Sequence, residues 1–474
     1  MTTINAESMH RLAKMVLDSG EVSSPEEALH LFSRYRLRIH LGTGWADTIA
    51  GQACFLTALN TAARAFLGGV EVHGDLTPAL RVPLYDGRIS QAIVEELGGV
   101  IVDDPISSLP TLVLGGWPKN HAPKFCVSLS WDAWCASVTP IKHESALICV
   151  LDNPLAGVAA AALGVNEAFS YVRGDQPDAG HRTIGLSLWN PLAVIDWHAE
   201  IYRGPVLQFL PSSLWLVGLG HLGQAYAWAL GMLPYSAGER PHLVLQDFDS
   251  VAKSNLSTCL LLNAADLGKR KIRAVAERLE NAGFTTDLVE RRFGPGHQVL
   301  TNEPATALFG VDNVVARREL DSAGFAMMVE AGLGSGYRNF RDIRTHTFPG
   351  PRRPSEIWSA ADATQAAVEM NDAYKKLAHE RNDLCGMTQL ASRAVATPFV
   401  GALAAALVLA EVVRPLHGGG VHATLDLQMK NLRYRIGPLQ VEYNGLRTPY
   451  VQVAYPREAP SHATIAGALE EVRS

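Results

Sequence analysis

The chain has 474 residues, of which 47% are hydrophobic and 19% charged, and its formal net charge is -6. This length favours two domains, and the composition is typical of a soluble globular protein that buries large cores. The acidic balance and the lack of any Lys/Arg block exclude nucleic acid as an expected partner, because phosphate binding needs a basic face.

The first 34 residues are predicted to form a helical segment. They include Glu7 and no uninterrupted apolar core, so an amphipathic helix is expected rather than a secretory signal. The apolar run 398–413 is shorter than the ~20 residues of a membrane span and contains Glu411, which favours a buried core helix. The six cysteines form no CxxC pair and indicate neither zinc nor disulfides. We therefore expect a cytoplasmic protein without a membrane partner.

The same order of elements is predicted twice along the chain. Residues 37–41 read as a strand that runs into a glycine turn, a helix at about 50–67, a second strand from Val70, and Asp75. Residues 214–217 likewise precede a glycine turn, a helix that ends near Leu233, a strand at 242–246, and Asp247. Each half also contains a small-residue helix with the pattern Pro-x-x-Gly, then Ala-Ala-Ala-Leu and Glu, which starts at Pro154 and at Pro398.

This repetition predicts an α/β protein with two Rossmann-like halves, at 35–200 and 201–420, which form a single-chain pseudo-dimer. Residues 421–474 form a C-terminal extension in which apolar and polar residues alternate up to about Tyr455, as in a β-meander. The alternative is that two alanine-rich helices are alike by chance, but several kinds of element recur in one order, which favours duplication.

A nucleotide site is predicted at the start of the second half. Gly218, Gly220 and Gly223 form a GxGxxG motif between a strand and a helix, where backbone amides can approach phosphate. Asp247 ends the next strand, at a distance suited to ribose hydroxyls. This pattern alone fits either NAD or ATP. His221 within the turn is a candidate phosphate contact, although many residues fit that position.

The residues that follow Asp247 resemble the ThiF/MoeB and ubiquitin-activating-enzyme superfamily. The family pattern DxDxVxxSNLNRQ followed by GxxK is matched by Asp247, Asp249, Val251, the Ser-Asn-Leu at 254–256, and Gly268 with Lys271. Asp312, Asn313 and Arg317 resemble the family's downstream TDN element.

The resemblance implies a site for ATP and Mg²⁺. It implies that the glycine turn and Asp249 belong to the ATP site and that Asp247 binds the ribose. It further implies that Asn255 and Lys271 contact phosphate and that Asp312 organises Mg²⁺. Adenylation needs such a lysine, amide donors and metal, because a carboxylate attacks the α-phosphate and negative charge develops there.

Two of these residues also have ordinary interpretations. Lys271 lies beside a buried helical stripe formed by Ile272, Val275, Ala276 and Leu279, so it could be a solvated helix lysine. Asp312 and Asn313 could form a plain turn. The family spacing favours a site for both.

The sequence departs from the family pattern at Thr258, where the family has an arginine that neutralises the phosphates. Arg270, Arg36 and Arg64 are candidates for a substitute, because family members lend an arginine across their two-fold interface. The first half has no intact GxGxxG, and no Ser-Asn-Leu follows Asp75. We expect it to be an inactive, nucleotide-free copy.

Cys385 lies shortly before the helix at Pro398, where ubiquitin-activating enzymes carry their thioester cysteine, and its local sequence most resembles the autophagy-type enzyme. The alternative is a buried structural cysteine. Cys259 is expected to be simple packing.

The sequence therefore predicts ATP-dependent adenylation of the C-terminal carboxylate of a ubiquitin-like β-grasp protein, with a thioester at Cys385 and transfer to an E2-like conjugating enzyme or a target. A bacterial ubiquitin-like conjugation system is the expected setting, and a homodimer is left open. The alternatives are an inert adenylation-like scaffold, a ThiF-like adenylyltransferase in peptide modification or sulfur transfer, and an NAD-dependent oxidoreductase.

Overall fold

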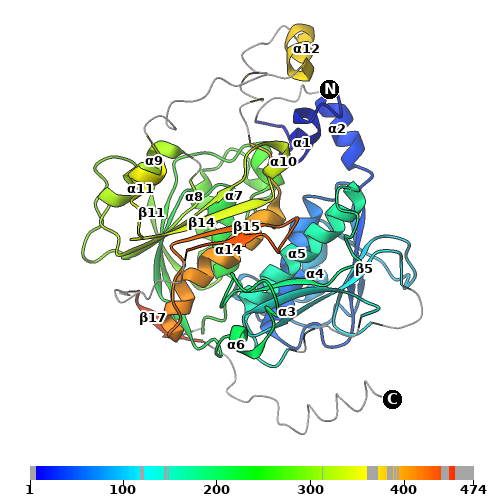
Figure 1. The fold of residues 1–474 in the computed structure, drawn as a ribbon, viewed down its shortest axis with the longest axis horizontal. Helices are drawn as coiled ribbons and strands as arrows, with labels where there is room; N and C mark the ends of the chain where they lie inside the picture. Colours follow the sequence, from blue (N-terminus) through cyan, green and yellow to red (C-terminus); the bar gives the residue numbers. More distant parts are fainter. Residues whose placement is uncertain are drawn as a thin grey trace.

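Two sheets of the same strand order, one in each half of the chain, form the computed structural model of this protein (Figure 1). The structure describes residues 7–117, 122–143, 147, 149–236, 238–311, 313–359, 372–381, 388, 391, 394–438 and 448–453. Within these residues, the first sheet has the order β3-β2-β1-β4-β5-β6-β7 and the second the order β11-β10-β9-β12-β13-β14-β15-β16. The predicted α/β fold with two Rossmann-like halves is confirmed.

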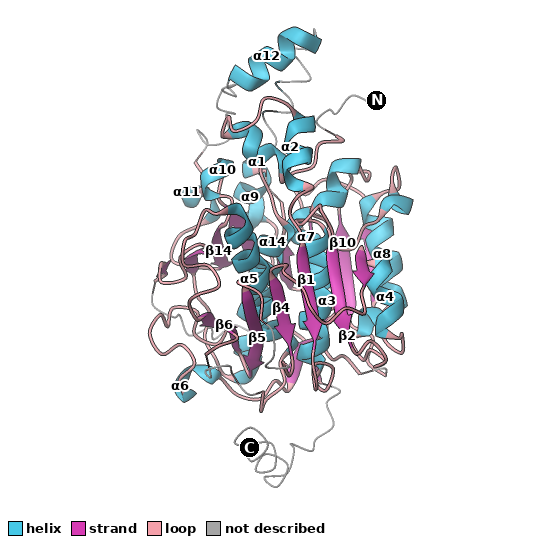
Figure 2. Cartoon of the chain, turned by 90° about the vertical axis from the view of Figure 1, so that its right-hand side faces the viewer, coloured by secondary structure: helices cyan, strands magenta, loops and turns pink. Residues whose placement is uncertain are grey.

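The strands of the first sheet lie side by side in Figure 2. They are β1 (Leu37–Leu41), β2 (Val70–Gly74), β3 (Gly99–Ile101), β4 (Thr111–Leu114), β5 (Cys126–Asp132), β6 (Cys135–Pro140) and β7 (Ile184–Ser187). The pairings from β3 to β5 are parallel, and those of β5 with β6 and of β6 with β7 are antiparallel. All five residues of β1 are buried, as expected for the centre of a parallel sheet.

The second sheet repeats this pattern. It contains β9 (Ser213–Val217), β10 (His242–Gln246), β11 (Thr285–Val289), β12 (Thr306–Phe309), β13 (Met327–Leu333), β14 (Asp342–Phe348), β15 (Thr424–Gln428) and β16 (Arg435–Ile436). Its pairings from β11 to β13 are parallel and those from β13 to β16 antiparallel. The C-terminal extension thus adds β15 and β16 to this sheet, whereas β17 (Tyr450–Gln452) pairs with β8 (Phe209–Pro211).

Four helices join the halves: α3 (Ile49–Ala63), α5 (Pro154–Arg173), α7 (His221–Leu230) and α14 (Pro398–Val413). α5 and α14 run next to each other in the middle of the molecule, with α3 packed on α5 and α7 on α14 (Figure 1). By length and composition, the segments 154–173 and 398–417 could each cross a membrane, but 89% of each is buried inside the protein. They are core helices of one hydrophobic cluster that includes residues of both halves.

The repeated Pro-x-x-Gly pattern has the same packing role in both halves. A Cβ on Gly157 would lie 2.1 Å from the carbonyl oxygen of Ala50, in the first turn of α3. A Cβ on Gly401 would lie 2.4 Å from Nε2 of His221, the first residue of α7. Each glycine therefore allows its helix to approach the start of the helix that follows the glycine turn.

The other α-helices lie around this core. They are α1 (Ala13–Asp18), α2 (Pro25–Phe32), α4 (Ser90–Glu96), α6 (Glu200–Arg203), α8 (Lys271–Asn281), α9 (Val314–Arg318), α10 (Gly336–Asn339), α11 (Pro354–Ile357) and α12 (Asp372–Arg381). The expected N-terminal helix corresponds to α1, which contacts α10 of the second half. Above it, α12 lies near α1 and α2 in Figure 1.

Candidate functional site

The glycine turn of the second half leads directly from β9 into α7. Gly218 has a φ of +81°, and a Cβ on Gly223 would lie 1.7 Å from the carbonyl oxygen of Gly218, so the turn requires glycine at both positions. A Cβ on Gly220 would meet nothing within 4 Å, and Gly220 caps α7 without a side-chain hydrogen bond. The space beside Gly220 is therefore open and, among the described residues, no side-chain hydrogen bond caps the start of α7, as an anion site requires.

Asp247 supports this turn. Its Oδ2 accepts the amide N–H of Leu219 (2.7 Å), and its Oδ1 accepts the amide N–H of Asp249 (2.7 Å). The carboxylate is 8% exposed, at the carboxyl end of β10 beside the point where the sheet order reverses between β9 and β12. Ligands of open parallel sheets bind at such a point.

Lys271 is the first residue of α8 and is not a solvated helix lysine. It is 7% exposed, and its Nζ forms an ion pair with Asp249 Oδ2 at 2.9 Å. Its amide N–H also donates to the carbonyl oxygen of Asp249 (3.0 Å). A buried charge is retained only with a partner, and Asp249, two residues after Asp247, is the partner of this one.

The Ser-Asn-Leu segment forms a 3-10 turn at Lys253–Ser257. Asn255 Oδ1 accepts the amide N–H of Ala252 (2.8 Å), which fixes this side chain at the start of the turn. Thr258, at the position of the family arginine, is buried and supplies no positive charge.

The N-terminal segment brings a different arginine to this turn. The amide N–H of Ser254 donates to the carbonyl oxygen of Glu7 (2.6 Å), and that of Arg11 donates to Ser257 Oγ (3.2 Å). Burial, together with the charge of Arg11, lowers the pKa of His221 to about 4. The backbone of Arg11 therefore lies at the 3-10 turn, a position that the sequence motifs did not indicate.

The three arginines considered from the sequence each form contacts with other residues. Arg36 pairs with Glu71 in the first half (2.6 Å). Arg64 crosses to the second half, but its guanidinium is held by the carbonyl oxygens of Leu262 (3.1 Å) and Asn60 (3.0 Å). Arg270 donates to the carbonyl oxygen of Phe248. These contacts are structural.

His221 does not serve the phosphate site. Its ring packs against Gly401 of α14, and its buried Nε2 has no hydrogen-bond partner among the described residues. The His221 ring therefore contributes to the packing of α7 against α14.

Asp312 lies outside the described residues, but the residues around it are fixed. Arg317 donates from Nε to the carbonyl oxygen of Val311 (3.1 Å) and from Nη2 to that of Ala331 (3.2 Å). Its Nε lies 3.4 Å from Oε2 of buried Glu330. Asn313 accepts the amide N–H of Val315 and so caps α9. Val311 and Asn313, the described residues on either side, are thus held at the carboxyl end of β12.

Cys385 also lies outside the described residues. The helix before it, α12, is attached to the N-terminal helix: the hydroxyl of Tyr374 donates to Asp18 Oδ1 (2.7 Å), and Lys14 Nζ donates to the same hydroxyl (3.2 Å). Cys259 is buried, and burial raises its pKa to about 11, which suits packing rather than nucleophilic chemistry. No cluster of three or more His, Cys, Asp or Glu suited to a metal occurs among the described residues.

The glycine turn of the first half is built differently. Four further residues separate it from α3, whose first amides are already bonded: Asp152 accepts from Ile49 (2.8 Å) and Ala50 (2.9 Å), and Thr48 accepts from Gly51 (3.0 Å). Asp152 therefore occupies the position at which a phosphate would bind to a helix N-terminus.

Comparison with known proteins places both halves in one family. The family model of the BilD N-terminal domain matches residues 36–188, and that of the BilD C-terminal domain matches residues 210–419. The chain is 40% identical to the "Bacterial E1-like protein BilD" of Collimonas sp. (strain OK412) over 459 residues, which cover 97% of this chain and 98% of that protein.

More distant proteins share shorter stretches. "Ubiquitin-activating enzyme E1 2" of Arabidopsis thaliana is 28% identical over 118 residues, which cover 23% of this chain and 11% of that enzyme. Among solved structures, E. coli MccB with SeMet MccA is 12% identical, with a TM-score of 0.32. The match covers 50% of this chain and 66% of the MccB chain, just under two thirds of the MccB length. Scores this low establish no shared activity.

Proposed function

The chain belongs to the BilD family of bacterial E1-like proteins, and we propose that it uses ATP and Mg²⁺ to activate the C-terminal carboxylate of a ubiquitin-like protein. The observation that carries this proposal is the uncapped N-terminus of α7 below Gly220, with Asp247 and the buried Lys271 beside it. A scaffold has no need of a buried, paired lysine next to an open helix N-terminus.

The proposed reaction has two steps. A carboxylate oxygen of the ubiquitin-like protein attacks the α-phosphorus of ATP, the bond to the β-phosphate breaks, and pyrophosphate leaves. The thiolate of Cys385 then attacks the acyl carbon of the resulting acyl-adenylate, and AMP leaves with the electron pair of the broken C–O bond. The acyl group is finally transferred to an E2-like conjugating enzyme or a target.

The residues of the second half have separate roles in the first step. Asp247 accepts the ribose hydroxyls, and the amides at the start of α7 bind phosphate oxygens. Lys271 and Asn255 stabilise the negative charge that develops at the α-phosphate. Mg²⁺, when bound, neutralises phosphate charge, and Asp312 is its proposed ligand.

Arg11 is the proposed substitute for the arginine missing at Thr258. Its backbone is bonded to Ser257 of the motif turn, and its charge acts on His221 at the start of α7. A cation carried by the N-terminal segment would enter the site only after that segment has docked on the 3-10 turn. The N-terminal helices would thereby control catalysis as well as support α12.

The first half is proposed to be the inactive copy. Its helix N-terminus is occupied by Asp152, and its glycine turn bonds to the loop after β4 through the amide N–H of Gly116 and the carbonyl oxygen of Thr43 (2.9 Å). One chain would then contain a single nucleotide site.

ATP–pyrophosphate exchange tests the adenylation step. A purified β-grasp protein with a free C-terminal carboxylate should support exchange, and the same protein without its last two residues should not. A thioester gel tests the second step: the wild type should give a thiol-sensitive adduct, and Cys385→Ser should lose it while exchange continues. Absence of exchange with any such protein would favour the scaffold.

A further inference from the structure

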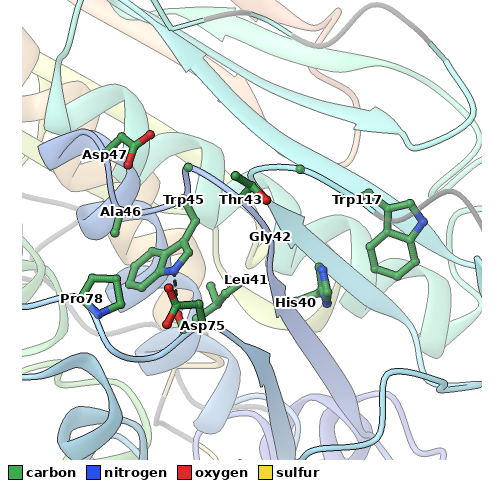
Figure 3. Close-up of a pocket in the computed structure, with 12 residues that line it drawn as sticks. His40, Leu41, Gly42, Thr43, Trp45, Ala46, Asp47, Asp75, Pro78 and Trp117 are labelled. Atoms are coloured by element: carbon green, nitrogen blue, oxygen red, sulfur yellow. Dashed lines mark hydrogen bonds between the residues drawn. The ribbon is translucent and has the colours of Figure 1, made fainter. Parts of the chain in front are cut away.

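A cavity of about 630 Å³ lies in the first half, at the carboxyl ends of β1 and β4 (Figure 3). This is the point at which the strand order of the first sheet reverses, and its counterpart in the second half is the proposed ATP site. The volume lies in the range of small-molecule pockets, which are common at such points. The cavity is therefore a place where a ligand is expected, although the motifs of a nucleotide site are lost.

The residues that line the cavity include carboxylates and no Lys or Arg, and the exposed Arg81 at its edge is bound to the carbonyl oxygens of Ala46 (3.1 Å) and Asp47 (2.7 Å). A Cβ on Gly44 would lie 3.1 Å from Oδ2 of Asp47, so this carboxylate lies over the glycine turn. Asp75 is exposed at the cavity, and Asp152 already binds the amides of α3. An anion at this turn would meet carboxylates where the second half offers amides and Lys271.

A buried histidine completes the lining. His40 is 7% exposed, and its Nδ1 lies 3.0 Å from Nδ1 of His73, so one ring donates and the other accepts. Burial, with the nearby His73 and Arg38, lowers the pKa of His40 to about 4, which keeps the ring neutral near pH 7. Its Nε2 has no hydrogen-bond partner among the described residues, and the Trp117 ring lies edge-on at 4.7 Å between centroids.

We propose that this cavity binds a small organic cation with N–H donors, a protonated amine or a guanidinium. Asp47 and Asp75 supply negative charge; Thr77 occupies Oδ1 of Asp75 with its amide (3.0 Å) and hydroxyl (2.6 Å), which leaves Oδ2 to the ligand. His40 accepts a hydrogen bond at Nε2 when its Nδ1–H donates to His73. The Trp117 ring adds a cation–π surface.

The site does not depend on the ATP reaction of the second half. Its cation could come from a free amine or from a lysine or arginine side chain of a bound protein. The chemistry is the same, because both present N–H donors on a positive charge. The two sources differ in the molecule that carries the charge, so the affinity for a free amine can be compared with that for a lysine-containing peptide.

Calorimetry of the full-length chain tests the proposal with two probes: agmatine as the free cation, and acetyl-Gly-Lys-Gly-amide as the side chain. We expect saturable binding at one site per chain, unchanged by ATP with Mg²⁺. Tighter binding of agmatine would indicate a free ligand, and tighter binding of the peptide a protein side chain. No saturable binding of either probe, or tighter binding of adenosine, would overturn the proposal.

Variants assign the binding to this cavity. The double variant Asp47→Asn/Asp75→Asn should weaken binding by at least about tenfold, and Trp117→Ala by about two- to fivefold. Glu95→Gln, an exposed carboxylate on α4, is the matched control and should bind as the wild type does. Unchanged binding in the double variant would contradict the proposal. Thermal unfolding of each variant shows whether it is folded, and Trp117→Ala provides a separate test if the double variant is not.

Discussion

In the second half, α7 starts directly after its glycine turn, and no side chain caps its first amides. In the first half, α3 starts four residues later, and Asp152 and Thr48 take three of its first amides. The sheets around both helices have the same order. We infer that sheet topology places a crevice in each half, and we propose that the group that satisfies the helix N-terminus decides whether the crevice can accept phosphate.

Removal of the lysine specific to the second half should have the largest effect. Lys271→Ala should lower ATP–pyrophosphate exchange by about a hundredfold or more, because a preorganised charge next to the phosphates is lost. Lys269→Ala is the matched control, since Lys269 is half-exposed and pairs with Asp266 at 3.2 Å. Equal activity of the two variants would contradict the assignment of Lys271.

Loss of the proposed substitute arginine should have a somewhat smaller effect. Arg11→Ala should slow exchange by about ten- to a hundredfold while the Kd for ATP changes little, because the charge matters most as it develops in the transition state. Arg34→Ala, on the neighbouring N-terminal helical segment, serves as the control for charge alone. A normal rate in Arg11→Ala would mean that another group replaces the missing arginine.

A substitution in the first half should make the N-terminus of α3 more like that of α7. Asp152→Ala removes the carboxylate from the N-terminus of α3, which should lower the free energy of unfolding by about 1 kcal/mol. The freed amides should then bind inorganic phosphate, so phosphate should raise the unfolding temperature of this variant more than that of the wild type. The exposed Asp103→Ala should show neither change. No response to phosphate would mean that Asp152 is not what excludes it.

The last effect concerns acid stability and involves no ligand. Burial and Arg11 lower the pKa of His221 from its ordinary value of 6.5 to about 4, so between these pH values the unfolded chain binds a proton that the folded chain does not. The free energy of unfolding should therefore fall as the pH drops from 6.5 to 4. His221→Gln should reduce this slope by up to about 1.4 kcal/mol per pH unit. The exposed His143→Gln should leave the slope unchanged; the same slope in both variants would contradict the assignment.

Local patterns in the sequence were sufficient for the elements, because strands, glycine turns and helices repeat in one order. They also indicated that Thr258 lacks the expected charge. They could not locate Arg11, whose contact with Ser257 joins residues 246 positions apart. Nor could they show that Asp152, more than 100 positions from Ile49, caps α3. Such contacts depend on how the halves and segments pack, which no local periodicity encodes. The roles of all the proposed site residues, Asp312 and Cys385 among them, stay predictions.

The most direct test of the account is calorimetric titration of the wild type and Lys271→Ala with ATP and Mg²⁺, and with NAD⁺. We expect one ATP per wild-type chain, loss of that binding in the variant, and no preference for NAD⁺. Two ATP molecules per chain would contradict the contrast between the halves. If neither protein bound ATP, the proposed adenylation activity would be contradicted. Preferential binding of NAD⁺ would show that the glycine turn binds a different cofactor.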